Sequence, residues 1–182
     1  MIKAKGGEKE AGLCSVIGDR ETMFRYMCAI FIAGLESGLL YATSERGEGY
    51  IIYTSTEGDE IKFTSGLKMI AGIIGAMGLK RTMAFLKSVQ KPGISLEDQM
   101  KEKKKRFVKV EMLVVIKKYQ GQGYMRQLMN IAYNAADKYG VPCILDIDGE
   151  NKRDKSCHLG MKQVGIRKIS EDSVMYDLIR EK

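Results

Sequence analysis

The chain has 182 residues, of which 45% are hydrophobic, and carries a formal net charge of +7. That is enough apolar sequence for one domain with a buried core and too little for two, so residues 1–182 are predicted to form a single domain. The four cysteines show neither C-x-x-C spacing nor a dense framework, and there is one histidine, which disfavours a disulfide scaffold and a metal site. No apolar segment follows the basic start, which disfavours a secretory signal, so we expect free thiols in a cytoplasmic protein.

The first part of the chain is predicted to be helical and then extended. Asp19 can cap a helix that runs to about Ser37, because its carboxylate can accept hydrogen bonds from the first free N–H groups of the helix. Tyr50 to Tyr53 is a short run of β-favouring residues, so a strand is expected there.

A glycine-rich apolar stretch occupies residues 67–86. Its uncharged centre, Met69 to Leu79, holds three glycines at three-residue spacing. This centre is shorter than the roughly 20 residues that a membrane-spanning helix needs, so no membrane contact is predicted. We expect a buried helix pair packed closely through the glycines, with a pocket lid or a dimer surface as the alternatives.

Residues 95–106 combine a helix signal with a run of positive charge. Ser95 can cap a short, highly charged helix, and residues 101–106 have the sequence KEKKKR. Because no aromatic residues are interleaved with this run and tryptophan is absent, a solvated helix end is favoured over a nucleic-acid or membrane-surface patch.

The most informative pattern lies between residues 107 and 147. Residues 107–116 alternate along a predicted strand, and a glycine turn, a helix from Met125 to Tyr139 and a strand from Cys143 to Ile147 follow. A crossover of this length favours two parallel strands, which puts the turn at the carboxyl end of the first strand, where ligands bind in such folds. The alternation predicts one apolar face with Val108, Val110, Met112, Val114 and Ile116, and a second face with Phe107, Lys109, Glu111, Leu113 and Val115.

The turn itself has the features of a phosphate site. Gly121 and Gly123 let the backbone approach a ligand closely and adopt positive φ. The first N–H groups of the next helix lack partners within the helix, and the peptide dipoles favour an anion there. On its own, a G-x-G pattern fits an ordinary tight turn equally well.

The residues around this turn resemble motif A of the GNAT superfamily of acyl-CoA-dependent N-acyltransferases. The family pattern is Gln or Arg, two residues, Gly, one residue, then Gly or Ala, and this chain matches it from Gln120 as far as Gly123. Residues 148–151 and 158–162 resemble motif B, in which an Asn opens a short helix. The resemblance covers residues 107–178, whereas residues 19–106 match loosely, chiefly through a first hairpin between residues 41 and 50.

The resemblance implies a mixed α/β (α+β) fold. In this fold a mostly antiparallel sheet with a central parallel strand pair is flanked by helices. Residues 107–182 would bind CoA and residues 1–106 would supply the acceptor-side helices and hairpin. Two positions depart from the family: Met125 replaces a second Gly or Ala, and Ser156 replaces the Tyr that commonly protonates the leaving thiolate.

The resemblance also implies acetyl-CoA as cosubstrate and no metal. The backbone of Leu113, Val114 and Val115 would hold the pantetheine arm as an extra strand, and Asn151 would contact it from the other side. The turn would hold the pyrophosphate through Gln120, Gly121, Gln122, Gly123, Tyr124 and Met125.

The implied chemistry is direct attack of a neutral amine on the thioester. Glu111 is the candidate base, acting through water, and Ser156 could relay a proton to the departing thiolate. Asp146 and Asp148 could attract a cationic acceptor. The structural alternatives are that Glu111 pairs with Lys109 or with a neighbouring strand, and that the two aspartates are solvated or cap a helix.

We therefore expect an N-acetyltransferase that transfers the acetyl group of acetyl-CoA to a primary amine of a small molecule or peptide. The first alternative is a catalytically weak acyl-CoA-binding sensor or regulatory protein of the same fold, because the usual general acid is missing. A second is a nucleic-acid-associated protein that uses residues 101–106, which the composition makes less favoured. A homodimer is left open.

Overall fold

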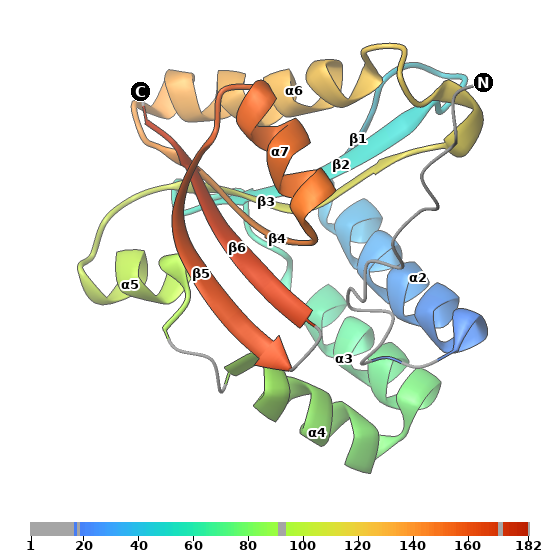
Figure 1. Ribbon diagram of the computed structural model, residues 1–182. Helices are drawn as coiled ribbons and strands as arrows, with labels where there is room; N and C mark the ends of the chain where they lie inside the picture. Colours follow the sequence, from blue (N-terminus) through green and yellow to red (C-terminus); the bar gives the residue numbers. More distant parts are fainter. Residues whose placement is uncertain (1–16, 18, 91–93, 171–172, 182) are drawn as a thin grey trace, which may run out of the picture.

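The computed structural model describes residue 17 and residues 19–90, 94–170 and 173–181 (Figure 1). In chain order the elements are α2 (Arg20–Ser37), β1 (Leu40–Ala42), β2 (Gly49–Ser55), α3 (Phe63–Met77), α4 (Leu79–Gln90), α5 (Leu96–Glu102), β3 (Val108–Val115), the short 3₁₀ helix η1 (Lys117–Tyr119), α6 (Tyr124–Tyr139), β4 (Cys143–Asp148), α7 (Glu150–His158), β5 (Lys162–Ser170) and β6 (Ser173–Arg180). The strands form one sheet in the order β1-β2-β3-β4-β6-β5. Neighbouring strands are antiparallel except β3 and β4, which are parallel. The predicted fold class is confirmed.

Helices cover both faces of this sheet (Figure 1). Helices α6 and α7 lie on one face, where Leu128 and Met129 of α6 are fully buried against the strands. On the other face, Ile52 packs beneath α2, and Phe107 packs beneath α5. Full burial of an apolar side chain of this size contributes about 1.5–3 kcal/mol, so both layers stabilise the sheet.

The predicted faces of β3 are wrong beyond Val110, because a β-bulge interrupts the strand. Tyr53 of β2 pairs with Val110, and the preceding Ile52 pairs with Met112, so Glu111 is the extra residue. Two residues opposite one partner shift the alternation by one position. The bulge divides the apolar residues differently from the prediction: Val108, Val110, Leu113 and Val115 face α6, whereas Met112 and Val114 face α2.

Helix α2 begins and ends as its sequence predicts. The Asp19 carboxylate accepts hydrogen bonds from the Thr22 backbone N–H at 2.9 Å and from the Thr22 hydroxyl at 2.7 Å, and these bonds lower the pKa of Asp19. The helix ends at Gly38, whose φ of 76° is the left-handed conformation that favours glycine. Gly34 permits close packing on the sheet, since a Cβ there would lie 2.4 Å from the Cδ1 atom of Ile52.

Three other local predictions are confirmed. The expected strands at residues 50–53 and 143–147 lie within β2 and β4. Ser95 caps α5 by accepting a hydrogen bond from the Asp98 N–H. Three cysteines, at positions 28, 143 and 157, are free thiols, and Cys14 lies outside the described residues.

The prediction of a buried helix pair at residues 67–86 is wrong. Helix α3 buries only Ser65 and Met77, and α3 and α4 meet at a sharp break at Gly78. Of the glycines, Gly72 makes a close contact, with Ala29 of α2, whereas a Cβ at Gly75 would meet nothing within 4 Å. In the described part of the chain no single helix is long and apolar enough to cross a membrane, and one pair bent by 108°, Phe63–Met77 with Leu79–Lys87, passes that test by length and composition only.

Candidate active site

The central feature is a gap between the two parallel strands. Pairing of β3 with β4 is confined to three residue pairs, of which the last joins Val110 and Leu145. Beyond this pair, β3 continues to Val115 and β4 continues to Asp148, but the two strands are no longer paired with each other. At about 3.3 Å per residue, the edge of β3 from Val110 to Val115 presents roughly 17 Å of backbone to this gap.

The glycine turn lies at the end of this edge. Gly121 and Gly123 have φ values of 77° and 85°, and α6 begins at Tyr124 with no side-chain cap and no acidic residue in its first turn. Gln127 is the residue whose N–H closes the first turn, to the Gly123 carbonyl at 3.2 Å. The preceding N–H groups of α6, including that of Met125, are therefore available to an anion, which the helix dipole also favours.

The two glutamines of the turn hold its shape. The Gln120 side-chain amide donates to the Val115 carbonyl at 3.1 Å, and that of Gln122 donates to the Lys118 carbonyl at 3.0 Å. Both side chains thus bond the backbone of the turn and leave the N–H groups of α6 uncovered.

The residues predicted to contact pantetheine lie on both sides of the gap. Leu113, Val114 and Val115 form the end of β3, which pairs with β2 on one side and with no strand on the side of β4. Asn151 lies in the first turn of α7, which follows β4. An extended ligand with amide groups could therefore add to the edge of β3 as a strand does, with α7 on its other side.

Ser156 is buried, whereas a side chain that donates a proton to the thiolate would need to reach the ligand. Its exposure is 0%, and its hydroxyl donates to the Lys152 carbonyl at 3.0 Å within α7. This bond to the preceding turn of the helix occupies the hydroxyl proton. The role of Ser156 in proton relay stays a prediction.

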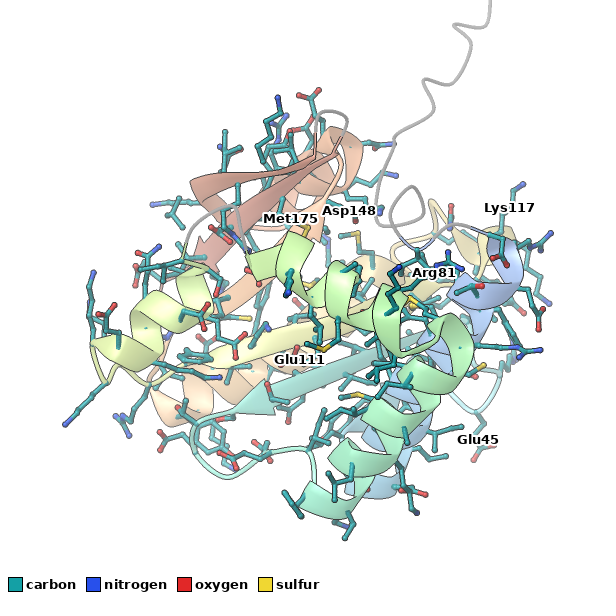
Figure 2. The ribbon with its side chains drawn as sticks, turned by 90° about the horizontal axis from the view of Figure 1, so that it is seen from below. Glu45, Arg81, Glu111, Lys117, Asp148 and Met175 are labelled. Carbon is teal, nitrogen blue, oxygen red and sulfur yellow. The ribbon has the colours of Figure 1, made fainter. Side chains whose placement is uncertain are left out.

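Glu111, the bulge residue, lies on the face of the sheet that Figure 2 shows from the side of α3 and α4. Its carboxylate accepts a hydrogen bond from the Thr54 hydroxyl at 2.8 Å and forms an ion pair with Lys109 at 3.2 Å. The structure thus contains both contacts of the structural alternative, to Lys109 and to the neighbouring strand. The side chain is 26% exposed, so water can still reach it.

Lys109 joins this carboxylate to a second one. Its ammonium group also contacts Glu97 of α5, and the Lys109 side chain is 14% exposed. Burial alone would lower the pKa of Lys109, but the carboxylates of Glu111 and Glu97 outweigh it and raise that pKa. A permanent positive charge therefore lies beside Glu111.

A buried charge cluster occupies the neighbouring strands. Arg167 of β5 donates two hydrogen bonds from Nε and Nη2 to Asp177 of β6, at 3.0 and 2.7 Å, and its Nη2 atom lies 3.4 Å from Asp146 of β4. Burial raises the pKa of Asp146 to about 6, against the opposing effect of Lys109 and Arg167. The side chains of Asp146 and Asp148 are 18% and 13% exposed, so neither is fully solvated, and Asp148 forms an ion pair with Lys152 at 2.6 Å.

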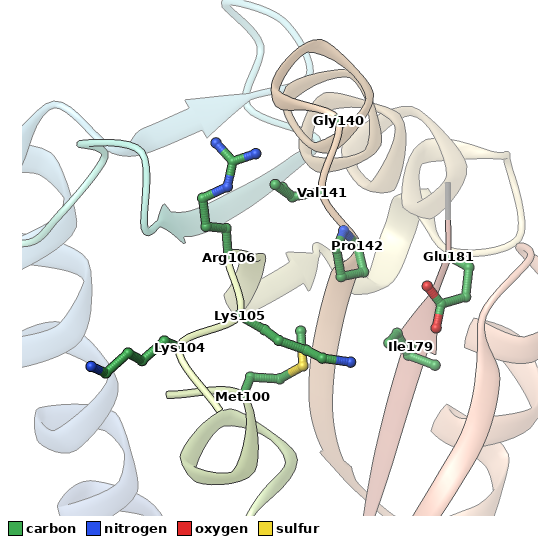
Figure 3. A pocket seen from close by; sticks show the side chains of 9 residues that line it. All are labelled: Met100, Lys104, Lys105, Arg106, Gly140, Val141, Pro142, Ile179 and Glu181. Carbon is green, nitrogen blue, oxygen red and sulfur yellow. The ribbon is translucent and has the colours of Figure 1, made fainter. Parts of the chain in front are cut away.

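A pocket of about 470 Å³ lies at the other end of the parallel pair (Figure 3). Its lining includes Lys104, Lys105 and Arg106 from the basic run, with Pro142 just before β4. The two strands are paired there, so this pocket is separate from the gap. Within the described ranges no group of three or more His, Cys, Asp or Glu side chains could hold a metal ion.

Sequence reasoning missed two contributions to the site. Lys117 and Lys118 lie in η1, which comes just before the glycine turn. Two positive charges next to a predicted phosphate site in the sequence would have been enough to predict their contribution. Thr54 bonds Glu111 only because of the bulged register between β2 and β3, for which the sequence carries no local signal.

Comparison with solved structures supports the fold. The chain resembles arylalkylamine N-acetyltransferase 2 from Aedes aegypti with a TM-score of 0.52 and 11% identity, over 92% of this chain and 84% of that one. It resembles the polyamine N-acetyltransferase of Drosophila melanogaster with a TM-score of 0.50 and 10% identity, over 82% and 78%. A match to a protein of Agrobacterium tumefaciens, 19% identical with a TM-score of 0.39, spans 42% of this chain and 57% of that one. For the two insect enzymes, at 11% and 10% identity, the likeness shows the fold alone.

No curated protein matches the chain in sequence. Residues 69–163, just over half of the chain, match the acetyltransferase (GNAT) family. The matched segment includes β3, the glycine turn, α6, β4 and α7, which are the elements that form the gap and the helix N-terminus beside it. With its sheet order and its separated parallel pair, the chain belongs to the GNAT acetyltransferase family.

Proposed function

We propose that this protein transfers the acetyl group of acetyl-CoA to a primary amine. The observation that carries the proposal is the gap between β3 and β4, which opens beside an uncapped helix N-terminus. The unpaired edge of β3 offers backbone donors and acceptors to the amides of pantetheine, and the first N–H groups of α6 face the pyrophosphate. Lys117 and Lys118 add positive charge next to that position.

The reaction needs no covalent acyl-enzyme. The neutral amine nitrogen attacks the thioester carbonyl carbon and forms the new C–N bond, the C–S bond breaks, and the proton that the nitrogen then loses passes through water to the departing thiolate. N–H groups of β3 near the bulge would stabilise the negative charge that develops on the carbonyl oxygen. A thiol pKa of about 8.5 makes the thiolate an acceptable leaving group even without a strong acid.

The amine must first become neutral. For an amine with a pKa of about 10.4, deprotonation at pH 7 costs about 4–5 kcal/mol. Glu111 is the proposed acceptor of that proton through water, because its carboxylate is partly exposed on the bulge of β3.

Calorimetric titration with acetyl-CoA tests the binding half of the proposal. The variant Gly123→Glu places a carboxylate at the N-terminus of α6, where it should repel the pyrophosphate. Two like charges about 4 Å apart repel by about 4 kcal/mol at an effective dielectric constant of 20, which corresponds to roughly a thousandfold weaker binding.

The matched control is Gly38→Glu. Gly38 has a φ of 76° and no neighbour within 4 Å, so it carries the same backbone strain and charge change at a different place. Binding that is lost in Gly123→Glu and retained in Gly38→Glu supports the site. Equal affinity of both variants for acetyl-CoA would refute it.

Thiol release in the presence of a panel of primary amines then tests turnover. We expect release with at least one amine, and a fall in kcat in the Glu111→Gln variant with little change in KM for acetyl-CoA. Tight binding with no release from any amine class would instead favour the sensor hypothesis.

A further inference from the structure

Helices α3 and α4 carry an unusual surface in which the apolar stripe faces outward. On α4, Leu79, Met83 and Leu86 are spaced as neighbours on one helix face, and their exposures are 62%, 47% and 46%. The opposite side of α4 faces inward, where Phe85 packs edge-on against Tyr26 of α2. An amphipathic surface helix normally buries its apolar stripe, so this stripe lacks a partner in the described chain.

Helix α3 repeats the arrangement. Phe63, Leu67 and Ile70 share one face and are exposed by 80%, 53% and 51%. Helices α3 and α4 lie at the same end of the molecule, away from α6 (Figure 1). Of the thirteen large hydrophobic residues that are exposed in the described part of the chain, nine belong to α2, α3 and α4, so exposed apolar surface is concentrated at this end.

The charges that α3 and α4 themselves carry are all positive, and one of them, Lys68, pairs with Glu36 of α2 at 2.8 Å. From Phe63 to Lys87 the sequence contains four basic residues and no acidic one. Lys80 and Lys87 each follow a stripe leucine, so they lie about 100° around α4, along one edge of the stripe. Apolar side chains bordered by cations match a surface that presents hydrocarbon beneath negative charge.

We propose that α3 and α4 dock on the surface of an anionic phospholipid bilayer. At 15 residues and 12 residues, the two helices are about 22 Å and 18 Å long, which is short of the roughly 30 Å hydrocarbon core. They would therefore lie in the interface with their stripes in the lipid and their lysines at the headgroups. The sequence predicts no membrane contact, because the apolar run is too short to span a bilayer. Docking on the bilayer surface does not require a spanning length.

A second copy of the chain fits this surface less well. A twofold interface brings the same patch against itself, so Lys80 and Lys87 would face identical charges, and neither α3 nor α4 carries a carboxylate that could neutralise them. Anionic headgroups neutralise these charges instead.

Vesicle flotation tests the proposal. The purified chain is mixed with vesicles of phosphatidylcholine alone or of phosphatidylcholine with phosphatidylglycerol. We expect binding to the anionic vesicles, at least tenfold weaker binding of the double variant Met83→Glu with Leu86→Glu, and about fivefold weaker binding for each of Lys80→Gln and Lys87→Gln.

The control carries the same changes elsewhere. Val164→Glu with Ile166→Glu alters two side chains of β5 that are 55% and 61% exposed, and it should bind as the parent does. Thermal unfolding establishes that each variant is folded. Failure of the parent to float with anionic vesicles, or equal flotation of both double variants, would overturn the proposal. A dimer of the parent in sedimentation would also overturn it, if Met83→Glu with Leu86→Glu gives a monomer and the control variant stays dimeric. That outcome would assign the surface to a second copy of the chain.

Discussion

Replacing Asp146 by Asn should stabilise the protein at neutral pH and leave its stability nearly unchanged near pH 4. Burial raises the pKa of Asp146 from 3.8 to about 6 in the folded chain, so between these values the folded state holds a proton that the unfolded state has lost. The stability that this proton contributes is present below about pH 4 and is lost as the pH rises through about 6. At 1.36 kcal/mol per pH unit, the loss amounts to about 3 kcal/mol, and Asn, which resembles the protonated form, avoids it.

Urea unfolding of parent and variant at pH 4 and pH 8 measures this effect. The difference in free energy of unfolding should be near zero at pH 4 and should favour the variant by up to about 3 kcal/mol at pH 8, since the pKa of about 6 already includes the opposing effect of Lys109 and Arg167. Asp154→Asn is the control, since the Asp154 carboxylate is 67% exposed and should give a small difference at both pH values. A difference that is independent of pH, or a variant less stable than the parent at pH 8, would refute the assignment of a protonated Asp146.

Three further predictions concern single side chains. Ser156→Ala should leave kcat within about twofold and cost about 1 kcal/mol of stability, because it removes one buried hydrogen bond to Lys152; a tenfold fall in kcat in a stable variant would instead show that the hydroxyl acts in catalysis. Gly165→Ala should destabilise the protein by about 1–3 kcal/mol in thermal unfolding, because the new Cβ would lie 2.6 Å from Oδ2 of Asp177 and displace a buried ion pair; an unchanged Tm would contradict this packing. Gly75→Ala should raise stability by about 0.5–1 kcal/mol, because the site is inside a helix with open space around it, and a loss measured in the same assay would show a contact that the structure lacks.

Local chemistry determined the elements that the sequence predicted correctly. The Asp19 and Ser95 caps and the left-handed glycines of the turn involve groups within three or four residues of each other, so their sequence is sufficient to specify them. The glycine turn followed by helical spacing likewise identified the phosphate-like position and the resemblance that the family match confirms.

Tertiary structure decided what depends on residues far apart in the chain. The bulge at Glu111 arises from pairing with β2, about 60 positions earlier, and it moves Met112 to the face opposite the predicted one. The packing of whole helices likewise determines that Ser156 is buried and that the apolar stripe of α4 faces outward. Helical periodicity shows that an apolar stripe exists but not which way it faces. The sequence by itself determined the local turns, caps and periods, and the register and packing between distant segments decided which groups line the gap and which meet solvent.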